Sequence, residues 1–116
     1  MQTQIQLTFR SIAHSDALAI HLQQRADKLD QLFDRILWCH VVIELGGHHH
    51  RHGDRYVFSI NLGLPGHEIV VTRSPATGRD DETAYESADR AFDEAARQLR
   101  DWVGRRRGSR HEEVGR

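Results

Sequence analysis

The sequence predicts an α+β domain of order β-α-β-β-β-α, with two helices packed on one face of a four-stranded mixed sheet. Two stretches carry apolar residues at helical spacing, and four shorter stretches either alternate apolar with polar residues or are rich in β-branched residues. With 116 residues, of which 38% are hydrophobic, the chain can bury one modest core. We therefore expect a single domain, over residues 1–103.

The first part of the chain is predicted to form a strand over residues 3–10 and a helix over about residues 16–36. The segment Ile5–Phe9 alternates apolar with polar side chains, which is the period of a strand with one covered face. Ser15 is a suitable N-cap for the helix that follows. The apolar stripe of this helix consists of Leu18, Leu22, Ala26, Leu29, Phe33 and Ile36.

Three further strands are predicted at residues 37–45, 55–62 and 68–73. Pro65 and Gly66 fit the central positions of a type II turn between the last two. A helix joins the first two strands of the sheet, so these should run parallel, whereas the short later links require antiparallel pairing. The strand at residues 37–45 carries apolar residues on both faces, which leaves open a homodimer through the uncovered face of the sheet.

A long second helix is predicted over roughly residues 82–103, followed by a basic, disordered tail at 104–116. The tail has no apolar period. The apolar stripe of the helix consists of Tyr85, Ala88, Phe92, Ala95, Leu99 and Trp102.

Four of the nine histidines cluster at residues 48–52, in the predicted loop between the second and third strands. Alternate histidines could share a face and bind zinc. A glycine-flanked loop, however, lacks the rigid frame and the cysteine or carboxylate neighbours of a dedicated site. We expect a surface loop with no metal site, and a metal-binding function remains the weakest alternative.

Other features exclude several classes of protein. The serines have no nucleophile-elbow context and no phosphate-binding glycine loop is present, so we expect neither an enzyme nor a cofactor. No apolar run approaches the roughly 20 residues of a membrane span, and the first residues lack the features of a signal peptide. A cytoplasmic protein without membrane contact is expected. Cys39, the single cysteine, is flanked by apolar residues and is expected to be a buried thiol.

Charge geometry on the first predicted helix favours contact with nucleic acid, although the net charge is only −1. One stripe of this helix contains no carboxylate, because Asp27, Asp30 and Asp34 occupy another stripe. Arg25 lies at its border. The carboxylate-free stripe consists of His21, Gln24, Lys28, Gln31 and Arg35.

The second predicted helix mixes its charges. Arg90 and Arg97 each have acidic residues four positions away on both sides, a pattern that mostly stabilises the helix itself. From Arg100 onward basic residues predominate, and they supply guanidinium groups suited to phosphate. These are Arg105, Arg106, Arg107 and Arg110.

The order of elements and four stretches together resemble the ribosome hibernation-promoting factor family, also called ribosome-associated inhibitors or sigma-modulation proteins. The resemblance covers residues 1 to about 103. The stretches are "SDALAIHLQQRADKLDQLFDRI", "CHVVIEL", "YVFSINLGLPGHEIVV" and "AYESADRAFDEAARQLRDW".

This resemblance implies a fold related to double-stranded-RNA-binding domains and a protein in the messenger and transfer RNA channel of the small ribosomal subunit. There it would block translation and stabilise idle ribosomes under stress or in stationary phase, through contacts with ribosomal RNA. A divergent α+β module that binds another protein remains the alternative. The RNA-contacting positions that the resemblance implies are Arg25, Lys28, Arg35, Arg90, Arg97 and Arg100.

Overall fold

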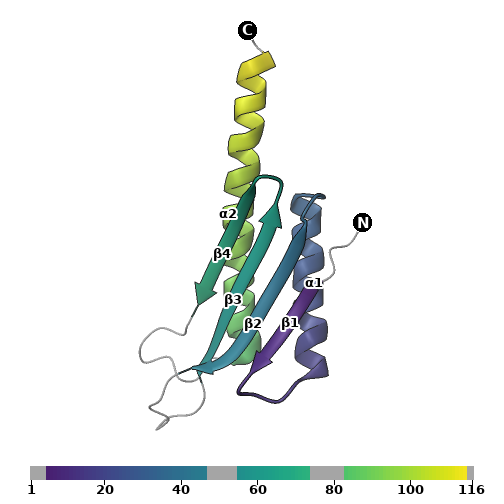
Figure 1. Cartoon of the computed structure of the whole chain (residues 1–116), viewed down its shortest axis with the longest axis vertical. Helices are drawn as coiled ribbons and strands as arrows, with labels where there is room; N and C mark the ends of the chain where they lie inside the picture. Colours follow the sequence, from purple (N-terminus) through teal and green to yellow (C-terminus); the bar gives the residue numbers. More distant parts are fainter. Residues whose placement is uncertain (1–4, 47–54, 74–82, 115–116) are drawn as a thin grey trace.

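The computed structural model of the chain describes residues 5–46, 55–73 and 83–114, and residues 45, 46, 55 and 108–114 by their backbone alone. The histidine cluster at 48–52 therefore lies outside the described residues. Six elements follow the predicted order β-α-β-β-β-α (Figure 1). They are β1 (Ile5–Arg10), α1 (Asp16–Leu32), β2 (Trp38–Gly46), β3 (Arg55–Leu64), β4 (His67–Arg73) and α2 (Ala84–Val114).

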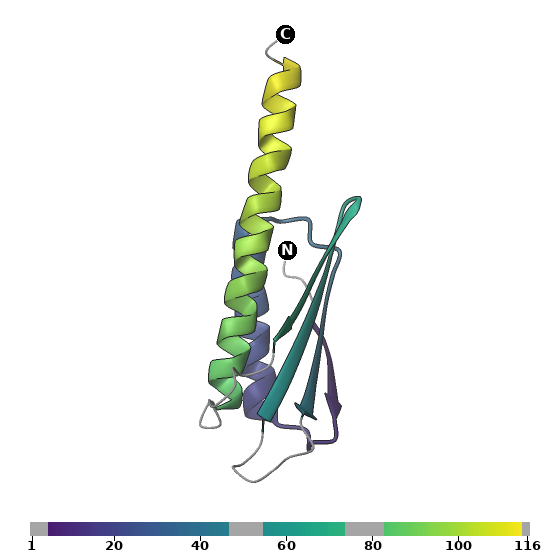
Figure 2. The same ribbon diagram turned by 90° about the vertical axis from the view of Figure 1, so that its left-hand side faces the viewer.

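The four strands form one mixed sheet in the order β1-β2-β3-β4. β1 runs parallel to β2, while β2 with β3 and β3 with β4 pair antiparallel, as predicted. Figure 2 shows α1 and α2 lying beside each other on the same face of this sheet. The fold class expected from the sequence is confirmed, and none of the described helices covers the opposite face of the sheet, which is called the uncovered face below.

Local signals in the sequence place the start of α1 and the turn between β3 and β4. The Ser15 hydroxyl accepts a hydrogen bond of 3.2 Å from the backbone N–H of Leu18, which confirms the N-cap. Gly66 adopts a φ of +71°, the left-handed conformation that a type II turn requires at its third residue.

The core lies between the two helices and the covered face of the sheet. Phe58 and Phe92 are its largest buried side chains, one from β3 and one from α2. Cys39 is 1% exposed, and burial, reinforced by the charge of Asp30, raises the pKa of its thiol to about 12. This thiol is therefore not a nucleophile at neutral pH, as the sequence predicted.

Helix α1 ends at Leu32, four residues before the predicted end. The backbone of Phe33 is extended, although its N–H still donates to the Leu29 carbonyl oxygen. Phe33 and Ile36 nevertheless pack against the core from the turn that leads into β2. The prediction was wrong here because their spacing satisfies the helical period whether or not the backbone stays helical.

Helix α2 begins at Ala84 and continues to Val114. A capping box sets its start: the Glu86 N–H donates to the Thr83 hydroxyl at 3.1 Å, and the Thr83 N–H donates to the Glu86 carboxylate at 2.9 Å. Residues 104–114 were predicted to be disordered but extend the helix. Adding residues to an existing helix is far easier than nucleating one, so such an extension needs no apolar stripe.

Tyr85 was predicted on the buried stripe of α2 but is 41% exposed, whereas Ser87 is fully buried. The remaining members of the predicted stripe up to Leu99 are buried. In the first turn of α2, the buried face is therefore the one that carries Ser87 and not the one that carries Tyr85.

The uncovered face of the sheet carries a packed tryptophan. Trp38 on β2 pairs in register with Gly63 on β3, and its indole N–H donates to the Asn61 side chain at 2.7 Å. A Cβ added to Gly63 would lie 2.2 Å from atoms of the Trp38 ring. The ring therefore occupies the space that any other residue at position 63 would fill.

We expect Gly63→Ala to lower the free energy of unfolding by about 1–3 kcal/mol, because the Trp38 ring must swing off the sheet and lose its hydrogen bond. Urea denaturation followed by circular dichroism measures the loss. The matched control is Gly104→Ala in α2, where an added Cβ meets no atom within 4 Å. Higher helix propensity should make this control slightly more stable. Equal stability of the two variants would contradict the packing of Trp38 on Gly63.

Candidate nucleic-acid interface

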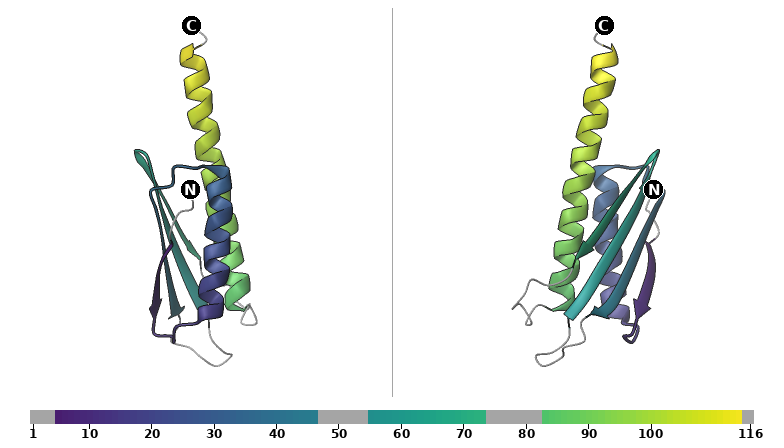
Figure 3. Two further views of the ribbon diagram at one scale, coloured as in Figure 1. Left: turned by 90° about the vertical axis from the view of Figure 1, so that its right-hand side faces the viewer. Right: turned by 60° about the vertical axis from the view of Figure 1, so that its left-hand side comes forward.

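The candidate interface is formed by the faces of α1 and α2 that point away from the sheet. The two helices lie side by side over the length of the sheet, and α2 then continues beyond it (Figure 3). Most of the arginines and the one lysine implicated by the sequence lie on these helices.

Arg25 joins the two helices. Its Nη1 donates to the Asp89 carboxylate at 2.9 Å and its Nη2 donates to the Asp93 carboxylate at 2.6 Å, while its guanidinium lies 5.8 Å from the centre of the Phe92 ring. The Arg25 side chain is only 19% exposed. Arg25 thus acts as a strut between α1 and α2, with its charge offset by two carboxylates.

His21 shares the carboxylate of Asp89, at 2.7 Å, and packs edge-on against Tyr85. Partial desolvation alone would raise the pKa of Asp89, but hydrogen bonds from His21 and Arg25, together with their charges, outweigh it and lower the pKa. The ionised carboxylate of Asp89 is therefore the hub of the contact between the helices.

Because the pKa of folded Asp89 lies below its ordinary value of 3.8, its stabilising contribution is present above that value and is lost as the pH falls through the lowered pKa. Asp89→Asn should therefore reduce the free energy of unfolding at about pH 5, and reduce it less at about pH 2. Asp89 is 41% exposed, so solvent screening limits the effect to about 1 kcal/mol. Urea denaturation at both pH values measures it. An equal loss at the two values would contradict this role.

Beside the strut, a groove of about 420 Å³ separates the two helices. Lys28 from α1 and Arg100 from α2 both line it and are both exposed. Neither forms an ion pair within the part of the chain that the structure describes. The groove is lined by Arg25, Lys28, Leu29, Gln31, Leu32, Asp93, Ala96 and Arg100.

Arg97 forms ion pairs with carboxylates of its own helix. It pairs with Glu94 at 2.5 Å and with Asp101 at 3.2 Å, and hydrogen bonds from Arg97 and Gln98 lower the pKa of Glu94 to about 2. The expected Arg97–Asp101 pair is confirmed. The expected pair with Asp93 does not form, since Asp93 binds Arg25 instead. Arg90 and Arg105 are exposed on α2 and do not line the groove.

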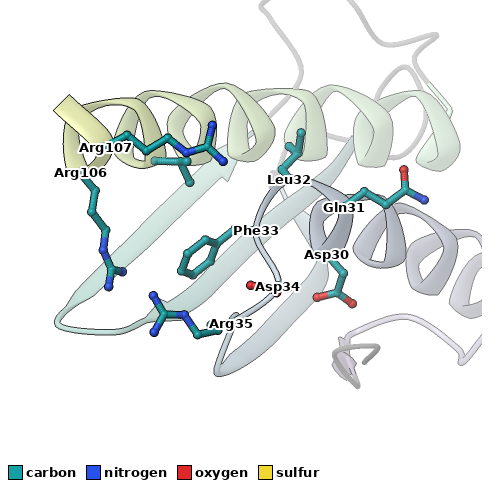
Figure 4. Close-up of a pocket in the computed structure, with 9 residues that line it drawn as sticks. Asp30, Gln31, Leu32, Phe33, Asp34, Arg35, Arg106 and Arg107 are labelled. Carbon is teal, nitrogen blue, oxygen red and sulfur yellow. The ribbon is translucent and has the colours of Figure 1, made fainter. Parts of the chain in front are cut away.

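Arg35 lies in the turn after α1, so the predicted stripe does not reach it. The prediction that Lys28 and Arg35 share one helical stripe is therefore wrong. Arg35 instead lines a second hollow of about 370 Å³ together with Arg106 and Arg107 (Figure 4). Asp34, predicted to point elsewhere, lines the same hollow.

The sequence did not reveal the contact between Arg25 and α2. A signal exists, because His21 and Arg25 lie four residues apart on one helix and Asp89 and Asp93 lie four apart on the other. Only the packing of the helices shows that these two pairs meet.

Comparison with known proteins places these features in a family. The family described as sigma 54 modulation protein / S30EA ribosomal protein matches residues 5–107. The chain belongs to this family. Its members are ribosome-associated factors without enzymatic activity. The resemblance seen in the sequence is thus confirmed.

Two solved structures share the fold. The N-terminal domain of Protein Y from Thermus thermophilus is 25% identical, with a TM-score of 0.66, and the match covers 88% of this chain and 99% of that one. A ribosomal subunit interface protein from Coxiella burnetii is 19% identical, with a TM-score of 0.67, and the match covers 86% and 97% of the two chains. Comparison with curated protein sequences gives no match.

In the described residues, no helix is long and apolar enough to cross a membrane. The same residues contain no group of three or more histidine, cysteine or carboxylate side chains that could hold a metal ion. The histidines at 48–52 are not among these residues.

Proposed function

We propose that this protein binds the ribosomal RNA of the small subunit in the channel used by messenger and transfer RNA, blocks translation and stabilises idle ribosomes under stress. Membership of a ribosome-associated family supports the partner. The similarity to the Thermus Protein Y domain extends over nearly all of that domain.

The observation that carries the proposal is the pair of exposed cations, Lys28 and Arg100, on opposite sides of one groove. An ammonium or guanidinium without a carboxylate partner is available to phosphate oxygens. The pair comes from two helices, so its spacing depends on how the helices pack. A rigid arrangement of this kind reads the shape of an RNA backbone more than its bases.

The other basic residues divide into distinct roles in this proposal. Arg25 keeps the helices at a fixed distance, while its own charge is offset by Asp89 and Asp93. Arg97 contributes less, because Glu94 and Asp101 already hold it. A near-neutral net charge is compatible with binding, since the carboxylates of these pairs account for part of the acidic total.

The mechanism is occlusion. A folded domain held on ribosomal RNA within the channel excludes the ligands that must pass through it, and no chemical step is required. Such a protein works in the cytoplasm with its ribosomes.

Co-sedimentation with isolated small subunits at increasing salt concentrations tests this function. Each neutralised phosphate releases counterions, so the logarithm of the binding constant should fall linearly with the logarithm of salt concentration. The slope of this line should steepen by about one unit for each phosphate contact. Binding that does not change with salt concentration would instead favour the alternative of a module that binds another protein.

A separate measurement on the free protein tests whether it forms the homodimer that the sequence left open. Such a dimer would use the uncovered face of the sheet, where Trp38 and Val70 are 37% and 57% exposed. Analytical ultracentrifugation of the free protein measures its mass directly.

A further inference from the structure

The hollow at the C-terminal end of α1 is separate from the groove that contains Lys28 and Arg100. It lies between the turn after α1 and the part of α2 around Arg106 (Figure 4). Gln31 and Leu32 line both spaces, so the two adjoin. The hollow is lined by Asp30, Gln31, Leu32, Phe33, Asp34, Arg35, Val103, Arg106 and Arg107.

Two guanidinium groups converge on one aromatic ring in this hollow. Arg35 lies 5.6 Å and Arg106 lies 5.8 Å from the centre of the Phe33 ring. In Figure 4 both guanidinium groups lie at the same end, with the Asp30 carboxylate at the other end. Within the described residues, neither arginine forms an ion pair that would offset the repulsion between them.

Arg106 also has a donor without an acceptor. Its Nη1 is buried and has no hydrogen-bond partner among the described residues. A buried charged donor left unpaired costs free energy that an incoming acceptor would recover. Its guanidinium is already held in place, 5.1 Å from the centre of the Trp102 ring, and that ring packs edge-on against Phe33.

We propose that this hollow binds a phosphate group through Arg35 and Arg106. Phosphate supplies several oxygen acceptors around one centre, so it can accept from more than one guanidinium fork at once and lower the repulsion between them. Arg107, exposed on the next position of α2, also lines the hollow, but its guanidinium group lies apart from the other two in Figure 4. The phosphate comes either from the RNA backbone, in which case the site rests on the proposed function, or from a free phosphorylated compound.

A nuclear magnetic resonance titration of the isotopically labelled full chain tests the site without the ribosome. Inorganic phosphate and adenosine monophosphate are the probes, with chloride at equal ionic strength as the reference. We expect saturable shifts confined to the amides of residues 31–35 and 103–107. Arg35→Gln combined with Arg106→Gln should abolish them, and the control Arg105→Gln, on the same helix but outside the hollow, should keep them.

Small-subunit binding by the same variants separates the two sources. If the double variant loses the saturable phosphate shifts of the unaltered protein but binds subunits equally well, the result supports the site and assigns it to a free compound. A roughly tenfold loss of subunit affinity in the double variant, but not in Arg105→Gln, supports the site and assigns it to RNA. If the double variant matches the unaltered protein in both measurements, the proposal is wrong.

Two further variants are needed. One distinguishes loss of the site from loss of folding, and the other distinguishes failure of this site from failure of the proposed function. Arg35 is exposed, so Arg35→Gln alone should fold normally and weaken the phosphate shifts even if the double variant is unstable. Arg100→Glu should impair subunit binding while the phosphate shifts persist. If the unaltered protein fails to bind subunits, the proposed function fails, whereas the titration still decides this site.

Discussion

Replacing Phe92 by alanine is expected to lower the free energy of unfolding by about 3–5 kcal/mol. Phe92 is fully buried on α2, within the core cluster that joins the helices to the sheet. Truncation loses the transfer free energy of the ring and leaves a cavity that the two layers only partly close. It also removes the surface under the Arg25 guanidinium and so loosens the strut between the helices. Urea denaturation with a linear extrapolation measures the loss.

The matched control for this substitution is Val70→Ala. Val70 lies on the uncovered face of the sheet and is 57% exposed. Its truncation should change stability by less than about 0.5 kcal/mol. A Phe92→Ala protein as stable as this control would mean that α2 packs on the sheet through a different face.

Reversing the charge of both Lys28 and Arg100 to glutamate is expected to weaken small-subunit binding by about a hundredfold or more. Two phosphate contacts are lost, and two carboxylates are introduced close to the RNA backbone. The slope of log affinity against log salt should fall by about two units. Both side chains are exposed, so the protein should fold normally. Binding to purified subunits and inhibition of in vitro translation measure the effect.

The control reversal uses Arg90 and Arg97, which lie on the same helix as Arg100. Arg97 is already paired with Glu94 and Asp101, so its reversal removes less available positive charge. Equal losses in the two double variants would show that overall charge, rather than the groove, governs binding. Normal binding by the Lys28 and Arg100 variant would place the RNA contact elsewhere on the domain.

The order of elements could be predicted because the apolar residues of this chain repeat at two clearly different periods, that of a strand and that of a helix. The alternation from Ile5 to Phe9 and the helical spacing from Leu18 to Leu29 each fit a single backbone conformation. The end of α1 could not be predicted this way. Phe33 keeps the helical spacing after leaving the helix, because a turn also returns its ring to the core.

The sequence was enough to identify basic residues of the candidate site, but not the carboxylates with which they form ion pairs. Lys28 and Arg100 were among the basic residues picked out from the sequence, and both line the groove. The neutralisation of Arg25 by Asp89 and Asp93 depends on two helices that are far apart in sequence. The hollow around Arg106 depends on an extension of α2 that has no apolar period to signal it.

The most direct test of the proposed function is a single-particle electron microscopy reconstruction of the protein bound to small ribosomal subunits. We expect density for the domain in the messenger and transfer RNA channel. The groove between α1 and α2 should face ribosomal RNA, with Lys28 and Arg100 within hydrogen-bonding distance of phosphate oxygens. Density outside the channel, or a domain that contacts RNA through the uncovered face of its sheet, would contradict the proposal.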